Sequence, residues 1–129
     1  MESLFIQATE ETPAVDYNIE TGVFKLTGRS LPENAIDFYA PILAWSEQLL
    51  SESEPQPYIF EFFFEYFNTA SSKQIVKMLL MMEKFIDKHT LIVRWMYEPE
   101  DTDMLNMGEQ YSKILKLPFE LIEKSIDTL

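Results

Sequence analysis

The feature that most constrains the fold is a run of aromatic residues at positions 58–67, which reads Tyr-Ile-Phe-Glu-Phe-Phe-Phe-Glu-Tyr-Phe. Every second residue, at positions 58, 60, 62, 64 and 66, is aromatic, and Glu61 and Glu65 alternate with them. Because successive side chains of a strand point to opposite faces of a sheet, this spacing predicts a central strand with one wholly apolar face. The run therefore predicts a sheet that packs beneath helices.

Further strands and helices alternate along the chain. Strands are expected at residues 4–7, 17–20, 23–27, 91–97 and 118–122, with a hairpin that turns at Gly22 and a short tail at the end. Helices are expected at 32–50, 69–88 and 104–115, joined by connectors at 12–15 and 51–57. Ser30 or Leu31 is expected to precede the first helix, and Pro41 to kink it or delay its start. This order predicts a single α/β (α+β) domain over residues 1–129, with parallel strands joined by right-handed crossovers.

Composition narrows the possible functions. The chain has no Cys, and its 22 acidic and 10 basic residues give a net charge of −12. Nucleic acids and anionic membranes are therefore unfavourable partners, since phosphate groups are bound by clustered Lys and Arg. The acidity suits either solubility or a surface that meets a basic protein. The lack of Cys, of a signal peptide and of a long apolar run predicts a cytoplasmic protein without membrane insertion.

The sequence gives little support for a catalytic site. Glu61 and Glu65 would share a strand face about 13 Å apart, whereas a glycosidase pair needs about 5–9.5 Å. No Gly-x-Ser-x-Gly motif occurs. The single histidine, His89, is expected to be a cation that stabilises the C-terminal end of a helix. The sequence thus predicts a protein that is not an enzyme, with a carboxylate hydrolase at Glu61 and Glu65 as a minor alternative.

A calcium loop is suggested only by Asp101 and Asp103. Asn106 stands where such a loop requires Gly, and Ser112 stands where it requires Glu. We therefore expect a solvated acidic loop, and neither a metal nor a cofactor.

A polar cluster follows the aromatic strand, where the second helix is expected to start. Asn68 or Thr69 can cap that helix, which stabilises it by about 0.5–2 kcal/mol. The same helix start favours an anion, because its N–H groups are free and the helix dipole is positive there. A phosphate on one of the hydroxyl groups would meet these N–H groups and Lys73, and would add a charge of about −1.5 to −2. Capping explains one of these residues but not four polar residues in a row, and from the residues alone capping and phosphorylation both remain open.

Residues 68–73, Asn-Thr-Ala-Ser-Ser-Lys, resemble the SiaC family of bacterial regulatory phosphoproteins. The resemblance extends over residues 12–122 and includes Thr12-Pro13-Ala14-Val15, Gly28, Ser30, Pro32-Glu33-Asn34, Trp45, Arg94-Trp95-Met96-Tyr97 and Pro118-Phe119. It implies a fold like that of the STAS domains, with a mixed central sheet and flanking helices.

The resemblance also implies a function. Thr69 would be phosphorylated by a dedicated Ser/Thr kinase and restored by a PP2C-type phosphatase. Family members commonly carry Ser where this chain has Ala70, so Ser71 and Ser72 are secondary candidates. The unmodified form would bind a GGDEF diguanylate cyclase, stimulating cyclic-di-GMP synthesis and biofilm formation. An anti-sigma factor antagonist or another STAS-type adaptor is the alternative. The expected partner-binding residues at the helix start are Asn68, Ser71, Ser72 and Lys73.

Overall fold

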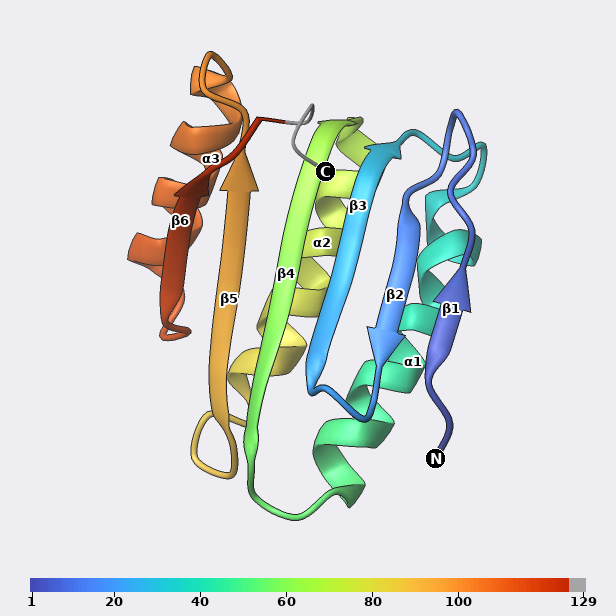
Figure 1. Cartoon of the computed structure of the whole chain (residues 1–129), viewed down its shortest axis with the longest axis vertical. Coiled ribbons are helices and arrows are strands. Elements are labelled where there is room, and N and C mark those ends of the chain that lie inside the picture. Colours follow the sequence, from blue (N-terminus) through green and yellow to red (C-terminus); the bar gives the residue numbers. More distant parts are fainter. Residues whose placement is uncertain (126–129) are drawn as a thin grey trace.

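The computed structural model describes residues 1–125, and its core element is one six-stranded sheet (Figure 1). The strands stand in the sheet in the order in which they follow along the chain. The first three pair antiparallel, and β3 to β6 pair parallel, which confirms the predicted mixed sheet. The strands are β1 (Leu4–Ile6), β2 (Ala14–Asn18), β3 (Val23–Ser30), β4 (Pro57–Phe67), β5 (Thr90–Tyr97) and β6 (Phe119–Glu123).

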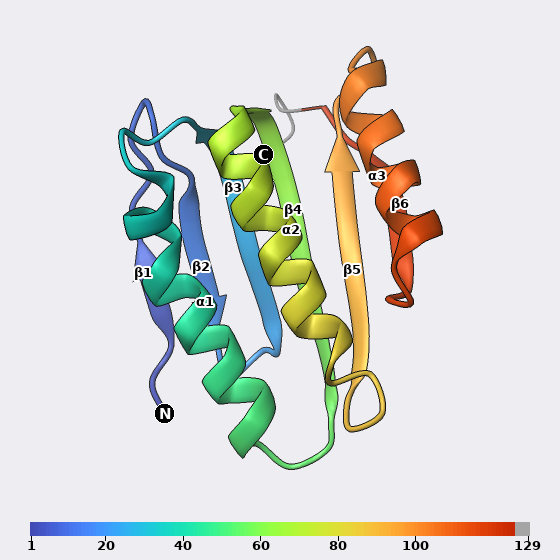
Figure 2. The same cartoon turned by 180° about the vertical axis from the view of Figure 1, so that it is seen from behind.

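Three helices connect the parallel strands, and all of them cover the same face of the sheet (Figures 1 and 2). They are α1 (Ala35–Glu52), α2 (Thr69–Glu83) and α3 (Thr102–Ile114). Helices α1 and α2 lie side by side, and both begin at the edge of the sheet where β3 and β4 end (Figure 2). The N-termini of two helices thus meet at one end of the molecule.

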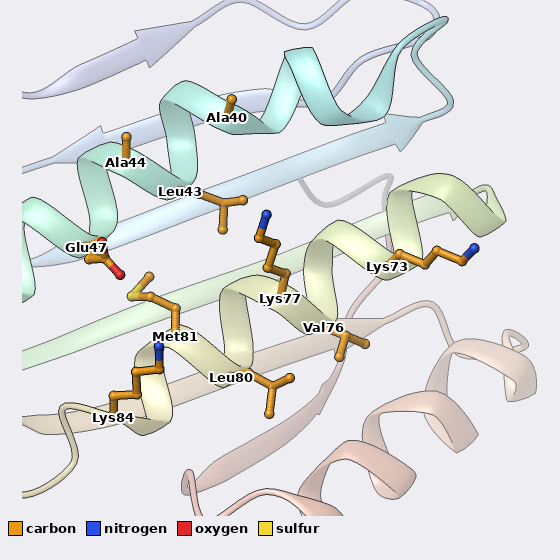
Figure 3. A pocket seen from close by; sticks show the side chains of 10 residues that line it. All are labelled: Ala40, Leu43, Ala44, Glu47, Lys73, Val76, Lys77, Leu80, Met81 and Lys84. Carbon is orange, nitrogen blue, oxygen red and sulfur yellow. The ribbon is translucent and has the colours of Figure 1, made fainter.

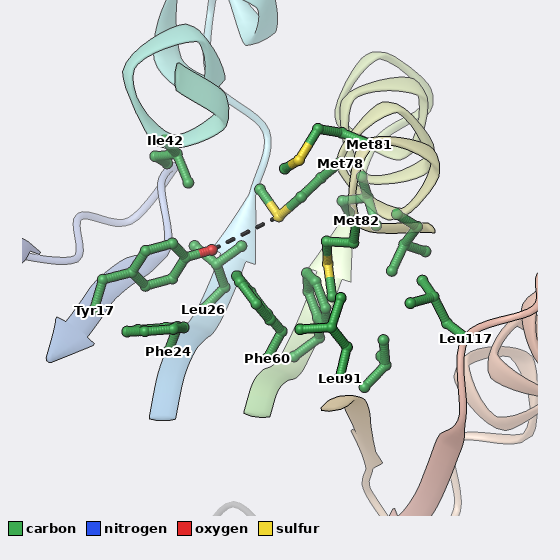
Figure 4. Packing of buried hydrophobic residues seen from close by; sticks show 14 of the residues in the cluster. Tyr17, Phe24, Leu26, Ile42, Phe60, Met78, Met81, Met82, Leu91 and Leu117 are labelled. Atoms are coloured by element: carbon green, nitrogen blue, oxygen red, sulfur yellow. Dashed lines mark hydrogen bonds between the residues drawn. The ribbon is translucent and has the colours of Figure 1, made fainter. Parts of the chain in front are cut away.

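The core fills the layer between the sheet and the helices (Figure 4). Phe60, Phe62 and Phe64 of β4 are fully buried there, as the alternating pattern predicts. Tyr17 of β2 reaches across the layer, and its hydroxyl donates a hydrogen bond to the sulfur of Met78 of α2 at 3.6 Å (Figure 4).

Trp95 of β5 occupies the part of the core nearest α3. Its ring lies 5.6 Å from that of Phe62, 6.4 Å from that of Phe67 and 5.5 Å from that of Tyr111, measured between centroids. The indole Nε1 donates a hydrogen bond to the carbonyl oxygen of Met104 at 2.9 Å. Trp95 therefore links β4, β5 and α3 through both packing and hydrogen bonding.

The strict alternation expected along β4 is wrong at its end. Gly28 pairs with Phe64 but Arg29 pairs with Tyr66, so the register slips by one residue and leaves Glu65 without a partner position in β3. An extra residue of this kind shifts the alternation of the strand that carries it. Tyr66 is consequently 47% exposed, and the partly buried Phe67 packs against the core instead.

Several element boundaries also differ from expectation. Helix α1 begins at Ala35, three residues late, because Asn34 caps it by accepting from the N–H of Asp37 at 3.0 Å. It continues through Pro41, which is exposed and cannot donate a backbone hydrogen bond to the preceding turn. The expected connector at 12–15 partly belongs to β2, whose pairing with β3 extends back to Ala14. The last four residues of the expected C-terminal tail lie outside the described residues.

The position predicted for His89 is also wrong. Helix α2 ends at Glu83, after which the chain continues in tighter turns, so His89 does not sit in its last turn. The imidazole is buried instead. Its Nδ1 accepts from the Gln56 N–H at 3.2 Å, so Nε2 carries the proton and donates to the Leu50 carbonyl at 2.8 Å. His89 therefore satisfies a carbonyl that α1 leaves unpaired in its last turn.

Candidate functional site

The polar cluster lies where β4 passes into α2. Asn68 is the N-cap, and its side-chain oxygen accepts from the N–H of Ser71 at 2.8 Å. Its own N–H donates to the carbonyl of Ser30 at 3.0 Å, which ties the helix start to the end of the neighbouring strand β3. Asn68 is therefore the capping residue, and the hydroxyl of Thr69 is not needed for that role.

The three hydroxyl groups of the cluster occupy different environments. Thr69 is exposed, and its hydroxyl makes no hydrogen bond within residues 1–125. Ser72 is partly buried, and its hydroxyl donates to the Thr69 carbonyl at 2.7 Å. Ser71 is completely buried. Only the hydroxyl of Thr69 is both exposed and unengaged.

Ser71 belongs to a buried chain of hydroxyl groups from three elements. The Ser30 hydroxyl donates to that of Ser71 at 2.8 Å, and the Ser71 hydroxyl donates to the Ser30 carbonyl at 3.0 Å. Because Ser30 has only one hydroxyl proton, the phenol of Tyr39, 2.6 Å away, must donate to it. Burial raises the pKa of Tyr39 to about 12, and its hydrogen bond with Ser30 counteracts part of that rise. These hydrogen bonds fix the starts of α1 and α2 against β3.

Replacing Ser30 with alanine is expected to lower the free energy of unfolding by about 1–3 kcal/mol, because the buried Tyr39 phenol loses its acceptor. The double variant Ser30→Ala/Tyr39→Phe should recover part of this loss, since neither partner then remains unsatisfied. Urea unfolding of the two variants and of Tyr39→Phe gives the coupling energy. If the losses in free energy of unfolding of the two single variants simply add up in the double variant, the hydrogen bond between Ser30 and Tyr39 is contradicted.

A hollow of about 520 Å³ separates Thr69 from the start of α1. The first N–H groups of both helices lack partners within their helices, so two positive dipole ends face this hollow. Lys73, one turn beyond Thr69, lines it as well, whereas Glu33 contributes a negative charge. The Ile36 side chain beside it is 65% exposed. Neither Ile36 nor the Tyr39–Ser30 contact could be found from the sequence, because both lie far from the cluster in the chain.

The acidic residues considered in the sequence have other roles. Glu61 lies 3.2 Å from Arg94, and Glu65 lies 3.9 Å from Arg29, so each carboxylate faces its own arginine. Asp101 caps α3 by accepting from the N–H of Met104 at 3.0 Å. Within residues 1–125, no three His, Cys, Asp or Glu side chains gather closely enough to hold a metal ion.

None of the helices in the described part of the chain has the length and apolar character needed to span a lipid bilayer.

Comparison with known proteins gives a consistent set of matches. The model of the SiaC family regulatory phosphoproteins matches residues 6–124. An uncharacterised protein of Pseudomonas aeruginosa (strain UCBPP-PA14) is 25% identical over 122 residues, which cover 94% of this chain and 96% of that protein.

Solved structures with the same fold come from the same organism. SiaC of Pseudomonas aeruginosa matches with a TM-score of 0.86 and 24% identity, covering 96% of this chain and 100% of that one. A chain in the crystal structure of the diguanylate cyclase SiaD in complex with its activator SiaC matches with a TM-score of 0.86 and 24% identity. The match covers 94% of this chain and 99% of that one. At this identity, the structural matches establish the fold.

Proposed function

Since this chain belongs to the SiaC family of regulatory phosphoproteins, we propose that it is a non-enzymatic switch controlled by reversible phosphorylation of Thr69. The observation that carries the proposal is the contrast among the three hydroxyl groups at the start of α2. Thr69 is exposed and unengaged, whereas Ser71 is buried and Ser72 is hydrogen-bonded to the backbone. A kinase can therefore reach the Thr69 hydroxyl without unfolding the helix.

The surroundings of Thr69 suit a phosphate. The modified side chain would stand at the N-terminus of α2, one turn before Lys73, and would face the start of α1 across the hollow. Both helix dipoles and the lysine favour the added negative charge. A Ser/Thr kinase and a PP2C-type phosphatase are the proposed enzymes that add and remove it.

The proposed partner of the unphosphorylated form is a GGDEF diguanylate cyclase, whose synthesis of cyclic-di-GMP would be stimulated. The proposal is supported by the structural likeness to SiaC, which has been crystallised with the cyclase SiaD. A single cytoplasmic domain over residues 1–129 is part of the same proposal.

Incubation with the cognate kinase and ATP is expected to add one phosphate to the wild type and none to Thr69→Ala, as measured by intact mass. Ser71→Ala and Ser72→Ala are the matched controls, and Ser72→Ala should be modified as fully as the wild type. Equal phosphate uptake by Thr69→Ala and the wild type would reject Thr69 as the acceptor. The chemical basis is that, of Thr69, Ser71 and Ser72, Thr69 is the one whose hydroxyl is exposed and makes no hydrogen bond within residues 1–125.

An affinity pull-down separates the proposed cyclase partner from the alternative. Thr69→Ala should capture a GGDEF protein, and Thr69→Glu should capture less of it, although a carboxylate reproduces the charge of a phosphate only in part. Capture of a sigma-regulating kinase in place of a cyclase would favour an anti-sigma factor antagonist.

A further inference from the structure

Gln74 of α2 is a buried polar side chain that lacks a partner. It is only 9% exposed, and its Oε1 is shielded from water without any hydrogen-bond partner within residues 1–125. The residue also lines the hollow beside Thr69. Since Oε1 is shielded, the Nε2 at the other end of the planar amide is the polar atom that can face this hollow. Buried polar groups nearly always find a hydrogen-bond partner, so the amide calls for an acceptor bound there.

The hollow is surrounded by further hydrogen-bond donors. Helices α1 and α2 each begin beside it with a capping asparagine that accepts from one N–H group. The first two N–H groups of each helix, at residues 35–36 and 69–70, have no acceptor within their own helix. Lys73 lines the hollow as well, and its side chain extends toward the start of α2, whereas that of Lys77 points toward α1 (Figure 3). Donors therefore approach the hollow from two helices.

The charges at the hollow favour an anion with several oxygen atoms. Lys73 is exposed and forms no ion pair in the described part of the chain. Glu33 lines the hollow and Asp37 stands in the first turn of α1, but both carboxylates are exposed to water and salt, which screen them. The positive helix ends and the lysine attract negative charge. A phosphoryl group, whose oxygens point in several directions, can accept from all of these donors at once.

We propose that Gln74 is a phosphate-binding residue, whose Nε2 donates to a phosphoryl group held in the hollow by the starts of α1 and α2. Thr69 lines the same hollow, so the expected occupant is the phosphoryl group on its hydroxyl, and in this respect the inference rests on the proposed function. Free inorganic phosphate offers the same chemistry. Because the bound group would join the starts of two helices, phosphorylation is expected to stabilise the fold in addition to changing the charge of the surface.

Inorganic phosphate tests the site on the unmodified protein. Added at constant ionic strength, with sodium chloride as the blank, it should shift the side-chain amide resonance of Gln74 and the backbone amide resonances of residues 35–36 and 69–70. Gln74→Met and Gln74→Glu should weaken binding at least about fivefold, because Met lacks the donor and Glu adds a negative charge. Gln48→Met makes the same substitution at an exposed glutamine of α1 that does not line the hollow, and it should leave the affinity unchanged.

A second measurement uses the protein after modification of Thr69 by its kinase. The second pKa of a phosphothreonine is ordinarily about 6, and ³¹P resonances report it. This pKa should be about 0.5 unit lower in the wild type than in Gln74→Met, because a donor stabilises the doubly charged phosphate. Phosphorylation should also raise the thermal midpoint of the wild type by about 3 °C more than that of Gln74→Met. Gln48→Met should follow the wild type in both measurements.

Three results would overturn the proposal: no phosphate-induced shift at Gln74, unchanged phosphate affinity in Gln74→Met, or an equal second pKa in the modified wild type and modified Gln74→Met. The titration with inorganic phosphate does not depend on the kinase. If the kinase leaves Thr69 unmodified while inorganic phosphate binds at Gln74, the phosphorylation is rejected and the binding site stands. If Thr69 is modified but neither measurement responds to the loss of Gln74, the binding role alone is rejected.

Discussion

Replacing Trp95 with alanine is expected to lower the free energy of unfolding by about 3–5 kcal/mol. The indole is fully buried and packs against aromatic rings of β4 and α3, so its removal leaves a large cavity. The substitution also removes the indole N–H that donates to the Met104 carbonyl. Since domains are commonly stable by about 5–15 kcal/mol, this loss is a large fraction of the total.

Urea unfolding followed by far-UV circular dichroism measures the effect. Tyr66→Ala is the matched control, because Tyr66 is an aromatic residue on the neighbouring strand β4 that is 47% exposed. Its ring lies 5.8 Å from the guanidinium carbon of Arg29, and its loss should lower the free energy of unfolding by under about 1 kcal/mol. Similar losses in both variants would show that Trp95 is not central to the packing of α3 on the sheet.

A second large effect is expected in alkaline solution. Burial raises the pKa of Tyr39 to about 12, and burial also raises that of Tyr17 above its ordinary range. Both phenols are protonated in the folded state at a pH where the unfolded chain loses these protons. Their contribution to stability is therefore complete below about pH 10 and is lost as the pH rises from about 10 toward 12. For Tyr39 the change is about 3 kcal/mol.

Urea midpoints at about pH 9, 10 and 11 test this dependence. The wild type should lose stability steeply above pH 10, and Tyr39→Phe should lose it less steeply because one of the two buried phenols is gone. The two proteins differ only at residue 39, so the difference between their slopes isolates the contribution of Tyr39. If the wild type and Tyr39→Phe lose stability equally steeply with pH, the raised pKa of Tyr39 is contradicted.

The sequence was most informative where the deciding contacts are local. The alternating aromatic run predicted β4 because side-chain period and burial are set within the strand itself. Asn68 was correctly placed as a possible cap, since it bonds to Ser71 only three residues away. The hairpin at Gly22 was also correct, because its φ of 70° suits glycine and is rarely adopted by other residues.

Predictions failed where distant elements decide the outcome. Tyr66 is exposed because the pairing of β4 slips opposite Gly28 and Arg29, which no pattern within β4 can show. The burial of Ser71 depends on Ser30, and that of His89 on the end of α1. The hydroxyl cluster could therefore be located from its local pattern, but that pattern could not show which of its three hydroxyl groups are buried or hydrogen-bonded.

The order of the strands in the sheet has a consequence for how the chain folds. Each strand from β2 to β6 pairs with the strand that precedes it along the chain, so its first partner has already been synthesised when it emerges. During synthesis, each pairing can form once the second of its two strands has emerged, and the crossover helices bring the ends together over short stretches of chain. Such sequential topology lowers the cost of loop closure. Each new strand then covers the edge left by the previous one, which limits the time for which an unpaired edge is open to aggregation.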